Sequence, residues 1–365
     1  MLDGRTEWEA TLFVLERIST RTILPNQGTM SLGRLIQIQS PKSFLLNISV
    51  GCGLALALFV LGCIPASAAE QPARHSLENY LKRLGYEPIP LKRDHGNHLY
   101  VYGELEGKSR SIGVDTGCSM TVVDSSVARK LKTLGKLGVQ LDDSVLGTVT
   151  RTNMYVMSIK IGSAMFTNQP AWSRTLDAGG QYVGDCLLGC DFFFRNFCLI
   201  DCTGQKLYVR ATEPPPQAEE ALGESLRRSG FHELKLGSAS RLMMTVSGKA
   251  NSEPIQLLLD TGAPWTQLDA RQTGRLHIEK DLTTRQVAGI GKAGTAWIDR
   301  TRLKSFDLGE LSFANIDVGV VDLSGWKIGE RGHRFSDVDG LLGADFLADH
   351  RALIDCHNRK LWLQP

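Results

Sequence analysis

The sequence predicts a mainly β protein of two similar lobes related by a pseudo-twofold axis, with few short helices. Three observations support this prediction: three blocks of sequence recur in the same order, the apolar runs in each copy are short and strand-like, and a polar, proline-rich segment separates the copies. With 365 residues, of which 42% are hydrophobic, the chain is long enough for both lobes to have a core of their own.

The internal repeat consists of three ungapped matches. LKRLGYEPIPL (81–91) matches LRRSGFHELKL (226–236), and DTGCSMTVVD (115–124) matches DTGAPWTQLD (260–269), both at an offset of 145 residues. LLGCDFFFRNFCLIDCTGQKLYV matches LLGADFLADHRALIDCHNRKLWL at an offset of 154 residues. Nine extra residues are therefore expected in a loop of the second copy.

These matches set the expected domain boundaries. The first lobe is expected over residues 76–210 and the second over residues 223–365. Residues 211–222, with three consecutive prolines, are expected to form an extended linker, because proline is excluded from sheet interiors and favours polyproline II.

Within each lobe, the runs before each Asp-Thr-Gly sequence have strand-like composition. YVMSIKIGSAMF (155–166) and RLKSFDLGELSF (302–313) are typical of two strands joined by a glycine turn. Short helices are expected after each Asp-Thr-Gly and each Leu-Leu-Gly sequence. Asp191 and Asp345 stand where a helix N-cap would accept backbone hydrogen bonds.

Residues 1–69 are expected to form an N-terminal extension outside the folded lobes. The uncharged, apolar stretch at 48–64 leads into small residues, which is the order of a secretory signal with a cleavage site after 66–68. Two other interpretations remain open: an uncleaved membrane anchor over residues 44–64, or a lipid on Cys63. All three place the folded part outside the cytoplasm, in the periplasm or secreted.

The two Asp-Thr-Gly sequences suggest a shared site. Each follows an apolar run that would deliver Asp115 or Asp260 to a strand end, where glycine permits a tight turn. If a pseudo-twofold axis brings both loops together, the carboxyl groups lie about 3 Å apart and share one proton. Such a pair hydrolyses an amide with water, because one member accepts a proton while the other donates a hydrogen bond to the carbonyl oxygen. No metal or cofactor is needed.

These motifs resemble the retroviral-type, or retropepsin-like, aspartic protease family, and the Leu-Gly-Tyr opening and LLGxDF…LIDC endings are similar to its bacterial exported members. The resemblance covers 76–365. It implies two acid-protease β-barrel lobes in a monomer that forms an intramolecular pseudo-dimer.

By the same resemblance, the site residues would have three roles. Asp115 and Asp260 would be catalytic, Thr116 and Thr261 would interlock beneath them, and Gly117 and Gly262 would shape the loops. The flap candidates are Gly147, in 145–153, and Gly289, Gly291 and Gly294, in 287–297. Cys118, Pro264, Cys190 and Ala344 depart from the family's pattern and predict that the two lobes differ around the site.

The expected function is therefore that of an aspartic endopeptidase acting on protein or peptide substrates. The alternative is a catalytically silent peptide-binding pseudoprotease of the cell envelope. A formal net charge of +2 with scattered basic residues does not suggest a nucleic-acid partner. The histidines show no metal-ligand spacing. Cys202 and Cys356 are repeat-equivalent, so they could bridge the lobes near the axis.

Overall fold

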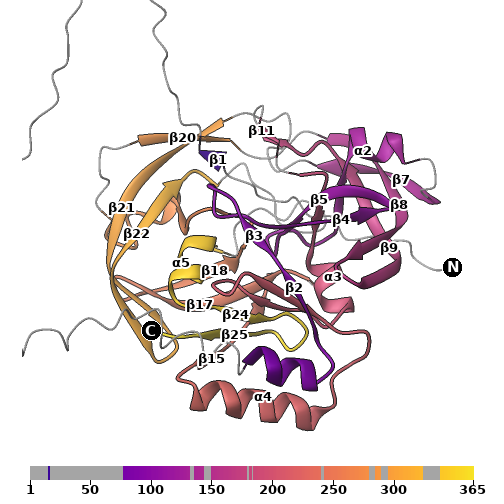
Figure 1. Ribbon diagram of the computed structural model, residues 1–365. Coiled ribbons are helices and arrows are strands. Elements are labelled where there is room, and N and C mark those ends of the chain that lie inside the picture. The colour runs from indigo at the N-terminus through magenta and orange to yellow at the C-terminus, as the bar shows by residue number, and fades with distance from the viewer. Residues whose placement is uncertain are drawn as a thin grey trace, which may run out of the picture. The chain divides into compact units, whose positions relative to one another are not determined.

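The computed structural model describes residues 15–16, 77–131, 135–143, 149–178, 181–182, 184–239, 242–278, 284–288, 295–323 and 338–365. They form two β-barrels joined by a third sheet (Figure 1). Several predicted features lie outside the described residues: the segment at 44–64, Cys63, and the flap candidates Gly147, Gly289, Gly291 and Gly294. In the described part of the chain, no helix is both long and apolar enough to span a membrane.

The first lobe is a closed barrel of six strands in the order β4-β5-β12-β6-β9-β8, and pairing of β8 with β4 closes it. Its strands are β4 (Leu99–Leu105), β5 (Lys108–Val114), β6 (Val122–Asp124), β8 (Val149–Ile161), β9 (Ala164–Arg174) and β12 (Cys186–Leu188). At its edges lie β3 (Lys92–Arg93) and β7 (Gly135–Asp143), and β10 (Asp177–Ala178) pairs with β11 (Gln181–Tyr182).

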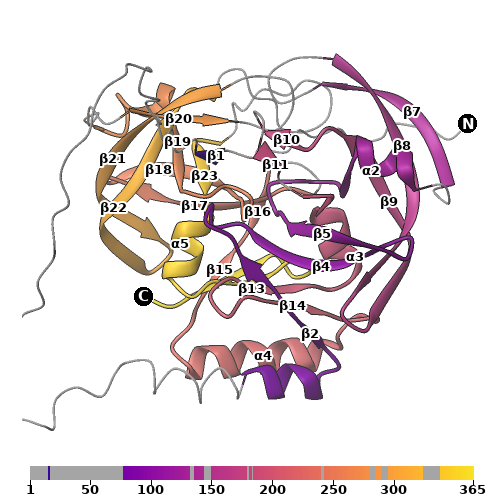
Figure 2. The same ribbon diagram turned by 45° about the horizontal axis from the view of Figure 1, so that its top comes forward.

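The second lobe repeats this barrel in the order β17-β18-β23-β19-β22-β21, closed by pairing of β21 with β17. Its strands are β17 (Met244–Ala250), β18 (Glu253–Leu259), β19 (Gln267–Asp269), β21 (Thr295–Leu308), β22 (Leu311–Val321) and β23 (Gly340–Leu342). β16 (Gly237–Ser238), β20 (Thr284–Ala288) and β1 (Leu15–Glu16) extend it. Figure 2 shows the two barrels as separate orange and magenta groups of strands.

The predicted strand–turn–strand units are present in both barrels. Gly162 (φ 61°) joins β8 to β9, and Gly309 (φ 59°) joins β21 to β22. Both glycines have the left-handed backbone that other residues adopt at a cost, which explains the strength of this sequence signal. The two predicted flap stretches each fall at a hairpin, β7–β8 and β20–β21.

A six-stranded antiparallel sheet joins the lobes in the order β15-β25-β24-β13-β14-β2. Its strands are β2 (Glu87–Pro90), β13 (Leu199–Asp201), β14 (Lys206–Val209), β15 (His232–Lys235), β24 (Leu353–Asp355) and β25 (Lys360–Leu363). At its centre Ile200 lies directly opposite Ile354, its repeat equivalent. The pseudo-twofold axis therefore passes between these two side chains.

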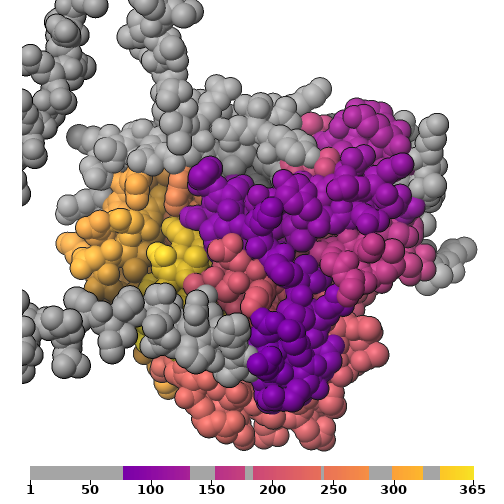
Figure 3. All heavy atoms as spheres, in the orientation of Figure 1, coloured from indigo at the N-terminus to yellow at the C-terminus, as the bar shows by residue number. Residues whose placement is uncertain are grey.

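The helices are short, apart from α4 (Pro216–Arg228). The others are α2 (Ser125–Lys130), α3 (Cys190–Arg195), α5 (Ala344–Asp349), the 3-10 turn η1 (Ala270–Gln272) and a helical segment at 77–83. In Figure 3, the indigo atoms of this first segment lie beside the salmon atoms of α4.

The extended linker expected over residues 211–222 is wrong from Pro216 onward, because this segment begins α4. Proline is compatible with the first turn of a helix, where its missing N–H would have no intrahelical partner. Leu222 and Leu226, one helical turn apart, are buried with Tyr208 and Trp362 of the joining sheet. Burial of this apolar face favours the helix.

Candidate active site

The two Asp-Thr-Gly loops lie at equivalent ends of the two barrels. β5 ends at Val114 and β18 at Leu259, so each strand delivers its aspartate directly to the loop. The Asp115 N–H donates to Leu188 O (3.1 Å) and the Asp260 N–H to Leu342 O (3.0 Å). Each Leu-Leu-Gly strand thus runs parallel to the strand that carries the aspartate and holds the start of its loop.

The two loops are tied to each other by their threonines. Thr116 N–H donates to Thr261 Oγ1 (3.0 Å), and Thr261 N–H donates to Thr116 Oγ1 (3.0 Å). Each hydroxyl also donates across the axis at 2.9 Å, Thr116 to Leu259 O and Thr261 to Val114 O. Four reciprocal hydrogen bonds, all buried, therefore fix the position of one loop against the other.

The glycine of each loop provides the surface on which the opposite carboxyl group lies. A Cβ atom at Gly117 would be 2.3 Å from Asp260 Cγ, and one at Gly262 would be 2.6 Å from Asp115 Oδ1. Any other residue at either position would overlap the carboxyl group of the other lobe. Glycine is therefore required here for close approach, since neither residue has a left-handed φ.

Asp115 and Asp260 are fully buried, and the carboxyl group of each affects the pKa of the other. Asp115 Oδ1 accepts from Gly117 N–H (2.9 Å), whereas Asp260 Oδ1 accepts from both Gly262 N–H (2.8 Å) and Ala263 N–H (3.1 Å). The second oxygen, Oδ2, receives no hydrogen bond from a backbone or hydroxyl donor of the described residues in either case.

Burial raises the pKa of both carboxyl groups, and it is the largest cause in each. The charge of Asp260 raises the pKa of Asp115 further, whereas the two loop N–H groups at Asp260 oppose the rise there. The pair thus favours a state with one shared proton.

The N-cap role expected for Asp191 and Asp345 is wrong. Gly189 and Gly343 are the N-caps of α3 and α5, and the aspartates lie inside the first turn. Asp191 Oδ1 instead accepts from the N–H (2.7 Å) and Oγ1 (2.8 Å) of Thr121, in the segment that follows the first Asp-Thr-Gly loop.

Asp345 makes the same pair of contacts to Thr266, at 2.8 and 3.0 Å. The recurrence of each Asp–Thr pair at the repeat offset was the available sequence signal for these supports, which connect helix, loop and Leu-Leu-Gly strand in each lobe.

A polar pocket of about 420 Å³ lies beside the first loop. Its lining includes Asp94, His98, Tyr100, Tyr102, Gly113 and Asp185. The sequence motifs did not point to this pocket, because its residues come from the turn between β3 and β4, from β4 and β5, and from the turn before β12, where Asp185 lies 74 residues after Ser111.

The six cysteines of the described lobes are buried and form no disulfide bond. The bridge considered between Cys202 and Cys356 is not formed. The strand register places Cys356 opposite Cys198, whose O accepts from Cys356 N–H (3.1 Å), and Cys202 opposite Ala352, whose O accepts from Cys202 N–H (2.9 Å). Among the described residues, no group of His, Cys, Asp and Glu side chains is arranged to hold a metal ion.

Comparison with known proteins gives two matches. The model of a family described as aspartyl protease matches residues 101–192 and 246–346, one segment in each lobe. Among solved structures, the chain is similar to the crystal structure of an aspartic proteinase from Irpex lacteus, with 14% identity and a TM-score of 0.46. That match covers 77% of this chain and 97% of the other. The sequence matches none of the curated proteins.

Proposed function

Since the chain belongs to the aspartyl protease family, we propose that it is an active endopeptidase whose catalytic residues are Asp115 and Asp260. The supporting observation is that the two buried carboxyl groups lie across the axis, each against the glycine of the opposite loop. Two buried carboxyl groups in contact are costly for folding unless they share a proton, and a shared proton is what this hydrolysis requires.

In the proposed reaction, Asp115 carries the proton and Asp260 is ionised, because Asp260 accepts one more backbone hydrogen bond. Asp260 takes a proton from water as the water oxygen attacks the carbonyl carbon of the peptide bond. Asp115 donates to the carbonyl oxygen. Transfer of a proton to the amide nitrogen then accompanies cleavage of the C–N bond, and the dyad returns to one proton.

The two threonines and two glycines act by positioning. The Thr116–Thr261 hydrogen bonds hold the loops in one arrangement before substrate arrives. Such rigidity matters because a displacement of about 1 Å in a reacting group costs roughly 100-fold in rate. The proposed substrate is a protein or peptide segment.

The test is hydrolysis of a denatured protein by the full chain and by Asp115→Asn and Asp260→Asn. Asparagine has the size of aspartate and keeps the Oδ1 acceptor, but it cannot share a proton with the other carboxyl group. Each variant should therefore lose at least about 1,000-fold in kcat/KM. Unchanged far-UV circular dichroism and unfolding behaviour would show that both variants fold.

Full activity in either variant would exclude the dyad. Peptide binding by the unaltered chain without new peptide termini would instead support the peptide-binding pseudoprotease.

We also propose that the folded lobes act outside the cytoplasm. The support is the apolar stretch at 48–64, followed by small residues, in the sequence. N-terminal sequencing of the protein recovered from cells distinguishes cleavage before Ala69 from a lipidated Cys63 and from an uncleaved anchor, and recovery in the cytoplasm would exclude all three.

A further inference from the structure

The pocket of the first lobe occupies a place that the second lobe fills with apolar side chains. At the repeat offsets, His98, Gly113 and Gly184 of the pocket correspond to Met243, Leu258 and Val338. The latter three are buried together in one apolar cluster, which also contains Ala263 of the second Asp-Thr-Gly segment. Two of the substitutions replace a large side chain by glycine, which accounts for the open space in the first lobe.

The walls of the pocket are built on the outer face of β4 and β5. Tyr100 pairs with Gly113 and Tyr102 with Ser111, so these residues share one face of the two strands. Asp185 is fixed at the edge of this face, because Ser111 N–H donates to its Oδ2 (3.0 Å) and its own N–H donates to Ser111 O (2.9 Å).

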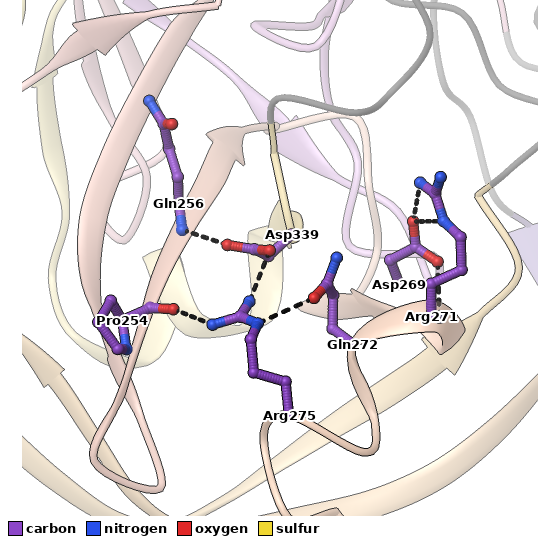
Figure 4. A network of polar contacts seen from close by, with 7 residues as sticks. All are labelled: Pro254, Gln256, Asp269, Arg271, Gln272, Arg275 and Asp339. Carbon is purple, nitrogen blue, oxygen red and sulfur yellow. Dashed lines mark hydrogen bonds and ion pairs between the residues drawn. The ribbon is translucent and has the colours of Figure 1, made fainter.

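The second lobe has the same carboxylate with a cation bound to it. Asp339, the equivalent of Asp185, accepts Gln256 N–H through Oδ2 (2.8 Å), as Asp185 accepts Ser111 N–H. Its Oδ1 accepts from the guanidinium group of Arg275 (2.7 Å). In Figure 4, this guanidinium lies between Asp339, Pro254 O and Gln272.

The first lobe has no such arginine. Lys130 stands at the position equivalent to Arg275, and among the described residues Asp185 forms no ion pair. Asp185 lines the pocket, and its Oδ1 is equivalent to the oxygen of Asp339 that binds a guanidinium group.

We propose that this pocket binds a lysine or arginine side chain of the peptide substrate, with Asp185 as its anionic partner. The tyrosines favour the same ligand, since aromatic faces attract cations. Lys92 already lies over the Tyr102 ring, with Nζ 5.0 Å from the centroid, and the ring remains 59% exposed. Because the equivalent region of the second lobe is apolar, the two sides of the dyad would select different side chains.

Other charged groups near the pocket also affect its preference for a cationic side chain. Asp94 is held by hydrogen bonds from Gly96 N–H and His98 N–H, and its contact with the His98 ring lowers its pKa, although burial opposes this. Asp94 is therefore paired with the His98 ring, whose Nδ1 lies 3.1 Å from its Oδ2. Arg110 also lines the pocket and is an opposing cation, and its Nη1 donates to Ser109 O (3.1 Å).

The pocket is close enough to the dyad to hold a side chain of a peptide that is bound there. Gly113 lies two residues before Asp115, a distance of about 7 Å along an extended strand. On the other side, Asn97 Nδ2 in the turn between Asp94 and His98 donates to Pro264 O (3.3 Å), just after the second loop. That the bound side chain belongs to a substrate rests on the proposed endopeptidase function.

The first experiment compares cleavage sites in denatured casein for the full chain, Asp185→Asn and Asp339→Asn. Asparagine preserves the acceptor for Ser111 N–H but removes the charge. Lysine and arginine should be enriched at one fixed position relative to the cleaved bond, and Asp185→Asn should lower this enrichment about tenfold, the value of one ion pair of roughly 1.4 kcal/mol. Asp339→Asn, the matched change in the other lobe, should leave the enrichment unchanged.

The second experiment needs no hydrolysis. Immobilised Asp115→Asn protein is equilibrated with a random octapeptide mixture, and the retained peptides are sequenced by mass spectrometry. They should be rich in lysine and arginine, and this excess should disappear in the Asp115→Asn, Asp185→Asn double variant.

Equal retention of basic and neutral peptides, or an excess that survives loss of Asp185, overturns the pocket proposal. If the unaltered chain cleaves nothing but its Asp115→Asn form retains basic peptides through Asp185, the pocket proposal stands and the proposed endopeptidase function fails.

Discussion

The two lobes match in the hydrogen bonds that interlock their threonines and differ in chemistry a few residues away. Around Thr116 and Thr261, every hydrogen bond of one lobe has a counterpart in the other. Beside these loops, Gly113 and His98 line a polar pocket where Leu258 and Met243 fill an apolar cluster. The reacting groups need partners from both lobes, which constrains both copies, whereas the flanks take no part in the threonine interlock and are freer to diverge.

The largest effect is expected from adding a methyl group beneath the dyad. Gly117→Ala would place a Cβ 2.3 Å from Asp260 Cγ, and Gly262→Ala would place one 2.6 Å from Asp115 Oδ1. Both should lower kcat/KM by more than about 100-fold through displacement of the carboxyl groups, with the greater loss at Gly117.

Steady-state kinetics on a casein-derived peptide would measure this, with Gly274→Ala as the control, because a Cβ there meets no atom within 4 Å. If either variant kept activity close to that of the unaltered chain, its glycine would not be needed to position the opposite carboxyl group.

A smaller effect is expected from removing one interlocking hydroxyl. Thr116→Val leaves Thr261 N–H and Leu259 O buried without their partners, and Thr261→Val does the same to Thr116 N–H and Val114 O. Each should lower the free energy of unfolding by about 2–4 kcal/mol, and by the same amount to within about 1 kcal/mol.

Urea denaturation would compare the two variants, with Thr→Ser at each position as a control that keeps the hydroxyl group. If the free energies of unfolding of the two variants differed by several kcal/mol, the hydrogen bonds of one threonine would account for most of the stabilisation.

The smallest effect concerns pH. Burial raises the pKa of Asp191 and of Asp345 to about 6, from 3.8. The folded protein then holds these protons more firmly than the unfolded chain, so the contribution of these two groups to stability is complete below about pH 4 and is lost as pH rises through about 6. Each aspartate accounts for a loss of at most about 3 kcal/mol.

Asp191→Asn and Asp345→Asn keep an acceptor for Thr121 and Thr266 and should each reduce this fall, by similar amounts. Denaturation midpoints at pH 4, 5, 6 and 7 would measure it, and a slope unchanged by both variants would contradict the assignment.

Much of the architecture could be predicted because the repeat relates residues that the chain keeps far apart. The offsets of 145 and 154 residues identified Asp115 with Asp260 and the two Leu-Leu-Gly strands with each other. The glycine turns at Gly162 and Gly309 were recognisable because a left-handed backbone strongly favours glycine.

Other features could not be predicted from local patterns. The three prolines before α4 are compatible with an extended linker or with a helix start, and only packing of Leu222 and Leu226 on the joining sheet decides between them. Asp191 sits at a plausible cap position, but its partner Thr121 lies 70 residues away in sequence.

By itself, then, the sequence determined the duplication, the β class and the pair of acidic residues, because these depend on recurrence and composition along the chain. Only the tertiary structure decided which groups meet: the carboxyl groups on the opposite glycines, Asp339 with Arg275, and Asp185 with none of the described cations. Such contacts depend on how strands close into a barrel and how two barrels meet at Ile200 and Ile354, and linear spacing does not encode that closure.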